Sequence, residues 1–181
     1  MTLRVAALLV VLLATVPAEG RHLTGLGVQE LTEKLVAPGF VLPTTSGHPT
    51  SLKEFRGSLV LLNFWATWCP PCVAEMPDLE RLHREFKAEG LVIVAVSIDT
   101  EGGKVVAPFW EKMGLTFPSL LDPSREVATR YGAWALPTSF LISPEGDVIA
   151  RIPGPRDWHT DRARAVFKNL LPGKTRREGR Q

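Results

Sequence analysis

The sequence contains little cysteine: only Cys69 and Cys72 occur among its 181 residues. A structural zinc site takes about four ligands, often as two such pairs. No second CxxC is present and the histidines show no HxxxH spacing, which argues against zinc. The loop between the two cysteines is also too short for a cross-link to remove much entropy from the unfolded chain. Redox chemistry is therefore favoured over a metal site or a structural disulfide.

Long hydrophobic runs are missing as well, apart from one near the N-terminus. Arg4 precedes Val5–Val16, an almost purely apolar stretch, whereas a membrane-spanning helix needs about 20 residues. Small residues around Ala18 resemble a cleavage site. We expect residues 1–20 to be a signal peptide or, alternatively, a short membrane anchor over residues 3–16. Either places the protein outside the cytoplasm, where disulfides persist. The absence of a nearby cysteine argues against a lipoprotein.

The charge is small overall but unevenly distributed. The formal net charge is +2, yet residues 151–181 hold nine Lys/Arg against three Asp/Glu. Residues 172–181 are basic without apolar periodicity, which predicts a disordered tail. Because this tail is short and accompanies no recognition motif, we expect no nucleic-acid partner. The length predicts one domain, over residues 37–171, after a linker at 21–36.

The hydrophobic pattern alternates between strand-like and helix-like segments. A short helix is predicted near Val28–Leu35 and a hairpin over 40–52. Further strands are predicted at 59–65, 91–98, 117–121, 138–142 and 148–152, and helices at 71–88, 104–113, 124–131 and 157–171. This order predicts an α/β fold with a mixed sheet and helices on both faces. The last two strands should form an antiparallel hairpin.

The CxxC lies between a predicted buried strand and a predicted helix. Cys69 should occupy the exposed end of that helix, where free N–H groups and the helix dipole favour an anion. This environment lowers the pKa of a thiol and yields a nucleophilic thiolate near neutral pH. A CxxC in this context indicates a redox motif.

Glu75 is the second candidate for a chemical role. At 100° per residue it falls within the apolar stripe of the helix, close to Cys72. Burial there should raise its pKa, so that the carboxyl group could exchange protons with Cys72. The alternative is that Pro77 kinks the helix and turns Glu75 toward solvent. His83, at the edge of the stripe, is expected to be a core or boundary residue.

Several motifs in order carry a resemblance to a known family. The stretch Asn63–Cys72 resembles the active site of the thioredoxin fold, although Asn63 replaces the acidic residue of cytosolic thioredoxins. The motifs at 37–42, 75–77, 136–142 and 144–151 are similar to those of exported TlpA/ResA-like thiol–disulfide oxidoreductases. The resemblance covers about residues 36–171. It implies a thioredoxin-like fold with an N-terminal β-hairpin and a central βα insert at 100–121.

The resemblance also implies roles for the CxxC. Cys69 is expected to be the attacking thiol and Cys72 the resolving thiol, so that exchange passes through a mixed disulfide with the partner. Pro70 and Pro71 should stiffen the active-site loop and remove two N–H donors. Their effect on the redox potential has no predictable sign.

A substrate-binding surface is implied beside the CxxC. In this fold the residue corresponding to Pro137 has a cis peptide bond and faces the disulfide. The backbone of Leu136 would then be free to pair with an extended substrate segment. Trp68 is expected to contribute to docking and Trp65 to the core. Trp134 is expected to have a structural role, with a place on the binding face as the alternative.

The family resemblance implies a reductant of disulfides in specific exported proteins. Such proteins serve cytochrome c maturation or copper-site assembly, in the bacterial periplasm or at the outer face of the cytoplasmic membrane, and a membrane thiol-transfer protein re-reduces them. We expect a monomer without a metal or a cofactor beyond the redox-active disulfide. The alternatives are a general oxidant or isomerase and, less favoured, a Cu(I)-handling module or a thiol peroxidase.

Overall fold

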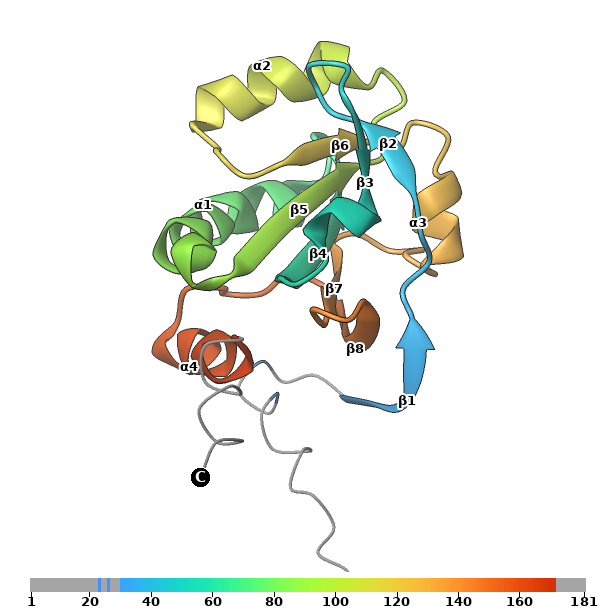
Figure 1. Cartoon of the computed structure of the whole chain (residues 1–181). Coiled ribbons are helices and arrows are strands. Elements are labelled where there is room, and N and C mark those ends of the chain that lie inside the picture. Colours follow the sequence, from blue (N-terminus) through green and yellow to red (C-terminus); the bar gives the residue numbers. More distant parts are fainter. Residues whose placement is uncertain (1–22, 24–25, 27–29, 172–181) are drawn as a thin grey trace, which may run out of the picture.

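A six-stranded mixed sheet forms the centre of the molecule in the computed structural model, which describes Leu23, Leu26 and residues 30–171 (Figure 1). The strands of this sheet are β1 (Glu30–Val36), β4 (Leu59–Trp65), β5 (Leu91–Ser97), β6 (Ser119–Leu121), β7 (Thr138–Ile142) and β8 (Asp147–Pro153). Two further strands, β2 (Val41–Pro43) and β3 (Pro49–Ser51), form a separate two-stranded sheet. The α-helices are α1 (Pro70–Phe86), α2 (Gly103–Met113), α3 (Glu126–Arg130) and α4 (Asp161–Leu170). Short 3-10 helices follow β3 and α1.

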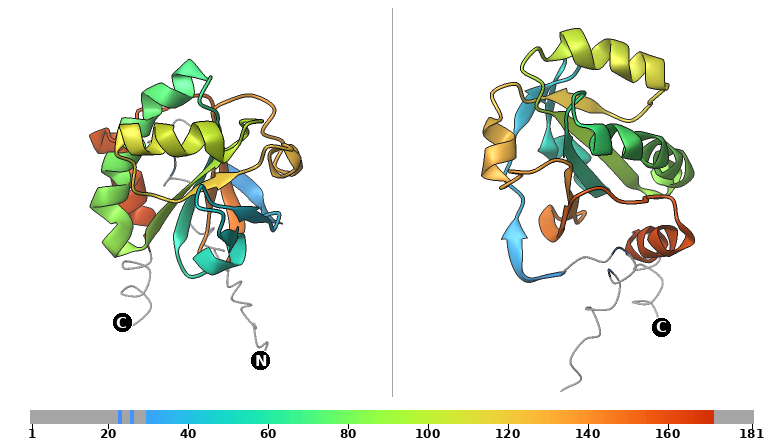
Figure 2. Two further views of the ribbon diagram at one scale, coloured as in Figure 1. Left: turned by 90° about the horizontal axis from the view of Figure 1, so that it is seen from above. Right: turned by 180° about the vertical axis from the view of Figure 1, so that it is seen from behind.

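The sheet has the strand order β1-β8-β7-β4-β5-β6. The β4, β5 and β6 strands are parallel, whereas β7 is antiparallel to both β4 and β8. Helices α1 and α4 lie on one side of the sheet, and α3 lies on the other side together with the β2–β3 hairpin (Figures 1 and 2). The sheet is therefore mixed and covered on both faces, as the sequence predicts.

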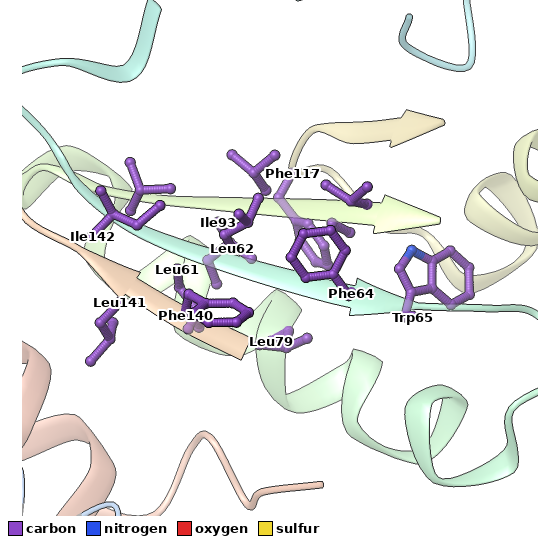
Figure 3. Close-up of a cluster of buried hydrophobic side chains, with 14 of the residues drawn as sticks. Leu61, Leu62, Phe64, Trp65, Leu79, Ile93, Phe117, Phe140, Leu141 and Ile142 are labelled. Atoms are coloured by element: carbon purple, nitrogen blue, oxygen red, sulfur yellow. The ribbon is translucent and has the colours of Figure 1, made fainter. Parts of the chain in front are cut away.

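Strand β4 lies at the centre of the core, and all seven of its residues are buried. Alternation along the strand sends Leu62 and Phe64 to the opposite face from Asn63 and Trp65. Phe64 contacts Phe140 (Figure 3) and Tyr131. A strand buried on both faces is a near-continuous apolar run, which is why β4 is recognisable in the sequence. Only Asn63 interrupts this run, and it faces α1.

The N-terminal segment differs from the prediction. The expected helix near Val28–Leu35 is wrong: residues 30–36 form strand β1, which pairs with β8 at the edge of the sheet. Leu31 and Leu35 are spaced like one face of a helix, yet both are exposed. The segment is held through main-chain pairing, which leaves no periodic signature in the side chains.

The other predicted elements are confirmed, with boundaries that differ by at most four residues. The insert at 100–121 comprises α2 and β6, and Trp110 of α2 packs on Trp65 and Phe117. None of the helices in the described part of the chain is long and apolar enough to cross a membrane. The predicted signal or anchor at 1–20 and the predicted tail at 172–181 lie outside the described residues.

Candidate active site

The two cysteines form a disulfide at the start of α1. Cys69 is the N-cap residue, and Pro70 and Pro71 are the first two residues of the helix. Proline is favoured here because its fixed φ suits the helix and its missing N–H would have had no intrahelical acceptor. The N–H of Cys72 is therefore the first main-chain donor of the helix. The sequence-predicted location of the CxxC, between β4 and a helix, is confirmed.

The exposure of Cys69 differs from the prediction. Its residue is only 5% exposed in the disulfide form, and Cys72 is completely buried. The physical reason is a turn in which the N–H of Cys69 donates to the carbonyl of Ala66 at 3.2 Å. Trp68, Pro70 and Pro71 are the exposed residues around it, and Trp68 has 63% of its surface accessible. Cys69 is still the more accessible of the two cysteines.

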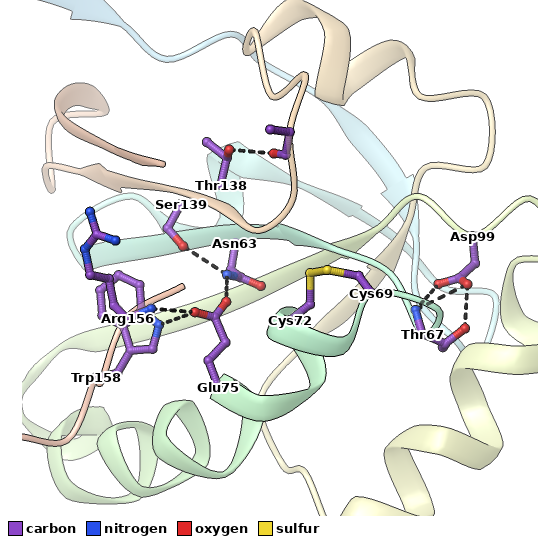
Figure 4. The surroundings of a disulfide bond; sticks show 11 residues. Asn63, Thr67, Cys69, Cys72, Glu75, Asp99, Thr138, Ser139, Arg156 and Trp158 are labelled. Carbon is purple, nitrogen blue, oxygen red and sulfur yellow. Dashed lines mark hydrogen bonds between the residues drawn. A yellow bond between two sulfur atoms is a disulfide. The ribbon is translucent and has the colours of Figure 1, made fainter. Parts of the chain in front are cut away.

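Glu75 lies inside the protein, and its predicted burial is confirmed. It is 4% exposed, and the kink that Pro77 could have caused does not turn it to solvent. One carboxylate oxygen accepts a hydrogen bond from Asn63 Nδ2 at 2.8 Å. The other accepts hydrogen bonds from Trp158 Nε1 at 2.9 Å and from the main-chain N–H of Arg156 at 3.2 Å (Figure 4). The carboxyl group is thus fixed on the side of α1 that carries Cys72.

The environment of Glu75 favours its protonated form. Burial raises the pKa of Glu75, and the hydrogen bonds from Trp158, Asn63 and Arg156 offset only part of that rise. A hollow of about 330 Å³, lined in part by Pro71, Glu75 and Arg156, lies beside the CxxC. A carboxyl group with a raised pKa at such a position is a better proton acceptor than an exposed glutamate and can give and take a proton.

The loop before β7 approaches the end of β4. The Leu136–Pro137 peptide bond is cis, as the family resemblance implies. Thr138 pairs with Phe64, so Pro137 lies beside the point where β4 leads into the CxxC loop. Trp134, with 71% of its surface accessible, belongs to the same loop. No residue in the described part of the chain forms a hydrogen bond with a main-chain group of Leu136.

Some residues of the site carry no obvious signal in the sequence. Trp158 is fully buried and donates its Nε1–H to Glu75. Ser139 accepts a hydrogen bond from Asn63 Nδ2 at 2.9 Å. These contacts join positions that are 76 to 83 residues apart in the chain, so no local pattern announces them.

Asp99 is a further buried residue that the sequence analysis did not single out. Its carboxylate accepts hydrogen bonds from the N–H and the hydroxyl of Thr67, just before the CxxC (Figure 4). A signal was available, since Asp99 lies two residues beyond the end of β5 and polar residues at the carboxyl ends of neighbouring parallel strands often meet.

His83 of α1 lies at the edge of the core. His83 packs against the ring of Phe117, and burial lowers its pKa. This is the predicted boundary role. Over residues 30–171, no group of three or more His, Cys, Asp and Glu side chains is arranged to hold a metal ion.

A thioredoxin-like sheet, a CxxC disulfide at a helix N-terminus and a cis-proline loop beside it define a thiol–disulfide oxidoreductase. Such enzymes exchange disulfides with protein substrates and redox partners.

Comparisons with known proteins agree with this class. The model of the AhpC/TSA family matches residues 34–151. The thiol–disulfide oxidoreductase ResA of Bacillus subtilis (strain 168) is 39% identical over 150 residues, which cover 82% of either chain. ResA of Geobacillus kaustophilus is 43% identical over 118 residues, covering 65% of this chain and 67% of the relative. The chain belongs to the AhpC/TSA family, among the ResA-like thiol–disulfide oxidoreductases.

Solved structures show the same fold. A thiol:disulfide interchange protein of the thioredoxin family from Chlorobium tepidum superposes with a TM-score of 0.67 at 29% identity, covering 77% of this chain and 99% of that one. StoA from Bacillus subtilis gives a TM-score of 0.58 at 30% identity, covering 66% and 90%.

Proposed function

We propose that this protein reduces disulfides of specific exported proteins outside the cytoplasm, in cytochrome c maturation or copper-site assembly. The observation that carries the proposal is the Cys69–Cys72 disulfide beside the buried carboxyl group of Glu75. The similarity to ResA and the apolar N-terminal run support the reducing direction and the location.

In the proposed reaction the thiolate of Cys69 attacks a sulfur of the substrate disulfide. A mixed disulfide forms and one substrate sulfur leaves as a thiolate. Cys72 then attacks the sulfur of Cys69, which releases the second substrate thiolate and leaves Cys69 and Cys72 joined. The substrate gains two electrons and the protein loses two. A membrane thiol-transfer protein is the proposed donor that restores the dithiol.

Glu75 is proposed to handle the proton of Cys72. Cys72 must lose its proton before it attacks, and a carboxylate on the same face of α1 can accept that proton. Asn63 cannot accept a proton in this way but does orient the carboxylate of Glu75 through its amide N–H. The proton-transfer role of the acidic strand residue in cytosolic thioredoxins thereby moves to the helix.

Trp68, Leu136 and Pro137 are proposed to bind the substrate. The main-chain groups of Leu136 can pair with an extended segment in the manner of an added strand, while the indole of Trp68 offers an exposed apolar contact. Pro137 has no N–H of its own, so it presents no donor to the sulfurs.

The reduction potential of the Cys69–Cys72 pair tests the proposal. The purified protein is equilibrated in thiol buffers of known potential, and the fraction oxidised is followed by thiol alkylation. A value near that of thioredoxin, about −270 mV, is expected for a reductant. A value near about −120 mV, that of a strong disulfide oxidant, would mean that the protein makes disulfides instead.

A further inference from the structure

Two adjacent strands of the sheet, β4 and β5, end next to the CxxC. Strands β4 and β5 are parallel, with Trp65 opposite Ser97, and the N–H of Ile98 donates to the carbonyl of Trp65 at 3.0 Å. Beyond this last ladder bond, β4 leads into the CxxC loop and β5 leads into Asp99. The side chain of Asp99 therefore meets the loop at its root.

Asp99 accepts hydrogen bonds from both donors of Thr67, its main-chain N–H and its hydroxyl. The main-chain N–H of Thr67 lies 3.0 Å from Asp99 Oδ2, and the hydroxyl of Thr67 lies 2.6 Å from Oδ1. The hydroxyl of Ser97 donates to Oδ2 at 2.7 Å, which orients the carboxylate from the other side. Asp99 is 3% exposed, and none of the Lys, Arg or His side chains described forms an ion pair with it.

A buried carboxylate without a cation is costly unless hydrogen bonds replace its water. Here those hydrogen bonds come mainly from the residue that precedes Trp68 and Cys69. On the far side of Cys69, Pro70 and Pro71 have a fixed φ. Cys69 therefore lies between two restrained points, one held by Asp99 and the other by the prolines.

We propose that Asp99 is a positioning residue for thiol–disulfide exchange, which acts through Thr67 to hold the sulfur of Cys69 and the indole of Trp68 where a partner disulfide can be attacked. This inference rests on the proposed role of Cys69 as the attacking thiol. Asp99 acts on the loop through Thr67 and takes no direct part in the exchange between sulfurs. Its contribution is to keep the loop in one conformation before and after the disulfide opens.

The fold contains a matched control for this arrangement. Thr116 donates its N–H to Glu80 Oε2 at 2.8 Å and its hydroxyl to Glu80 Oε1 at 2.8 Å. The Glu80 side chain is also mostly buried. Glu80 lies eight residues beyond Cys72 on α1, which is roughly 12 Å along the helix axis. A threonine thus donates the same pair of hydrogen bonds to a carboxylate at both places. Glu80 also pairs with Arg84, and only Thr67 adjoins the CxxC.

The test compares Thr67→Val and Thr116→Val in the full chain. Either variant removes one hydroxyl donor from a buried carboxylate and keeps the side-chain shape. The reduced proteins are mixed with insulin as the disulfide probe, the initial rate of reduction is measured, and the thermal midpoint is recorded for each. Thr67→Ser and Asp99→Asn are measured alongside them.

Thr67→Val is expected to slow insulin reduction about tenfold, because small displacements of a reacting group cost up to about a hundredfold. Thr67→Ser, which keeps the hydroxyl, should recover the rate to within about twofold of wild type. Asp99→Asn should be at least as slow as Thr67→Val, since an amide oxygen cannot accept from all of these donors at once. Thr116→Val, in which Glu80 keeps its pairing with Arg84, should lower the thermal midpoint no more than Thr67→Val does and leave the rate within about twofold.

The inference is overturned if Thr67→Val reduces insulin within about twofold of wild type, or if it loses no more rate than Thr116→Val. Asp99 would then only stabilise the fold. Because the proposed substrates are specific exported proteins, a wild-type protein that reduces no insulin leaves the proposed function to the reduction-potential measurement. In that case the alkylation rate of the Cys69 thiol in the same variants decides on Asp99: a slower rate in Thr67→Val alone supports the positioning role, and equal rates reject it.

Discussion

At the scale of single residues, the site depends on where one carboxyl group is buried. Glu75 lies on the apolar face of α1, and three donors from distant parts of the chain hold its oxygens. Glu85, on the same helix, is more exposed and is paired with Arg164. Two glutamates on one helix therefore have pKa values shifted in opposite directions: burial raises that of Glu75, and the hydrogen bond from Arg164 lowers that of Glu85.

Glu75→Gln tests the role of the buried carboxyl group. Exchange should slow by about a hundredfold, at the lower end of what acid–base catalysis contributes, and its pH profile should lose one step. Stability should change too. A raised pKa means that the native state of the wild type loses stability as the pH rises from about 4.3, the ordinary value for glutamate, through the raised pKa. Urea unfolding at several pH values should show that this loss disappears in Glu75→Gln.

Glu85→Gln serves as the control with the opposite sign. The lowered pKa of Glu85 contributes stability that is present above the ordinary glutamate value and is lost as the pH falls through the lowered pKa. The variant should therefore flatten the acid side of the stability curve and leave exchange unchanged. A Glu75→Gln protein with the wild-type exchange profile would rule out proton transfer by Glu75.

Residues of the site differ in how far the sequence predicts them. Cys69, Cys72 and Glu75 are close in the chain, so their spacing and the helical period are sufficient to predict their relation. Trp158 and Asp99 join the site only because the sheet brings distant segments together. A buried tryptophan and an aspartate after a strand are ordinary in isolation, and only their tertiary contacts bring them to the site.

At the scale of elements, the sequence predicts the buried strands far better than the edge. The apolar run of β4 has no competing interpretation, since all seven residues are buried. The β1 segment is different because Leu31 and Leu35 remain exposed and the strand is held through β8. The spacing of apolar side chains indicates which face of an element is buried. An edge strand that buries few side chains can therefore have apolar spacing that resembles a helix.

The same substitution on these two strands should have very different effects. Leu62→Ala on β4 should lower the free energy of unfolding by about 2–5 kcal/mol, because it leaves a cavity in a close-packed core. Leu35→Ala on β1, where the residue is 52% accessible, should cost no more than about 0.5 kcal/mol. Urea unfolding of the oxidised proteins measures both. A large loss in Leu35→Ala would mean that β1 is covered in solution.

At the scale of the whole molecule, the redox state and the stability of the fold are linked. A dithiol that is a good reductant has a native state that favours the disulfide, whereas a strong oxidant has a stabilised reduced form. The interval between about −270 and −120 mV corresponds to roughly 7 kcal/mol for two electrons. The direction of the stability change on reduction is therefore easily measurable.

We expect the protein to be more stable when oxidised. The urea midpoint should fall on reduction of Cys69–Cys72, and the thermal midpoint should fall with it. Cys69→Ala/Cys72→Ala provides the reference without either thiol. A reduced protein more stable than the oxidised one would contradict a reducing function by a route independent of the potential measurement.

The exposed indole of Trp68 has a consequence for the lifetime of the complexes this protein forms. A tryptophan buries about 150–250 Å² when fully covered, so covering the accessible part of Trp68 removes roughly 150 Å² from water, worth about 4 kcal/mol. Association itself costs about 4–15 kcal/mol, so such a contact holds a partner only briefly. In the proposed reaction the covalent mixed disulfide therefore sets the residence time, and the partner departs when Cys72 breaks that bond. Weak non-covalent binding is what allows one molecule to serve many substrates in succession.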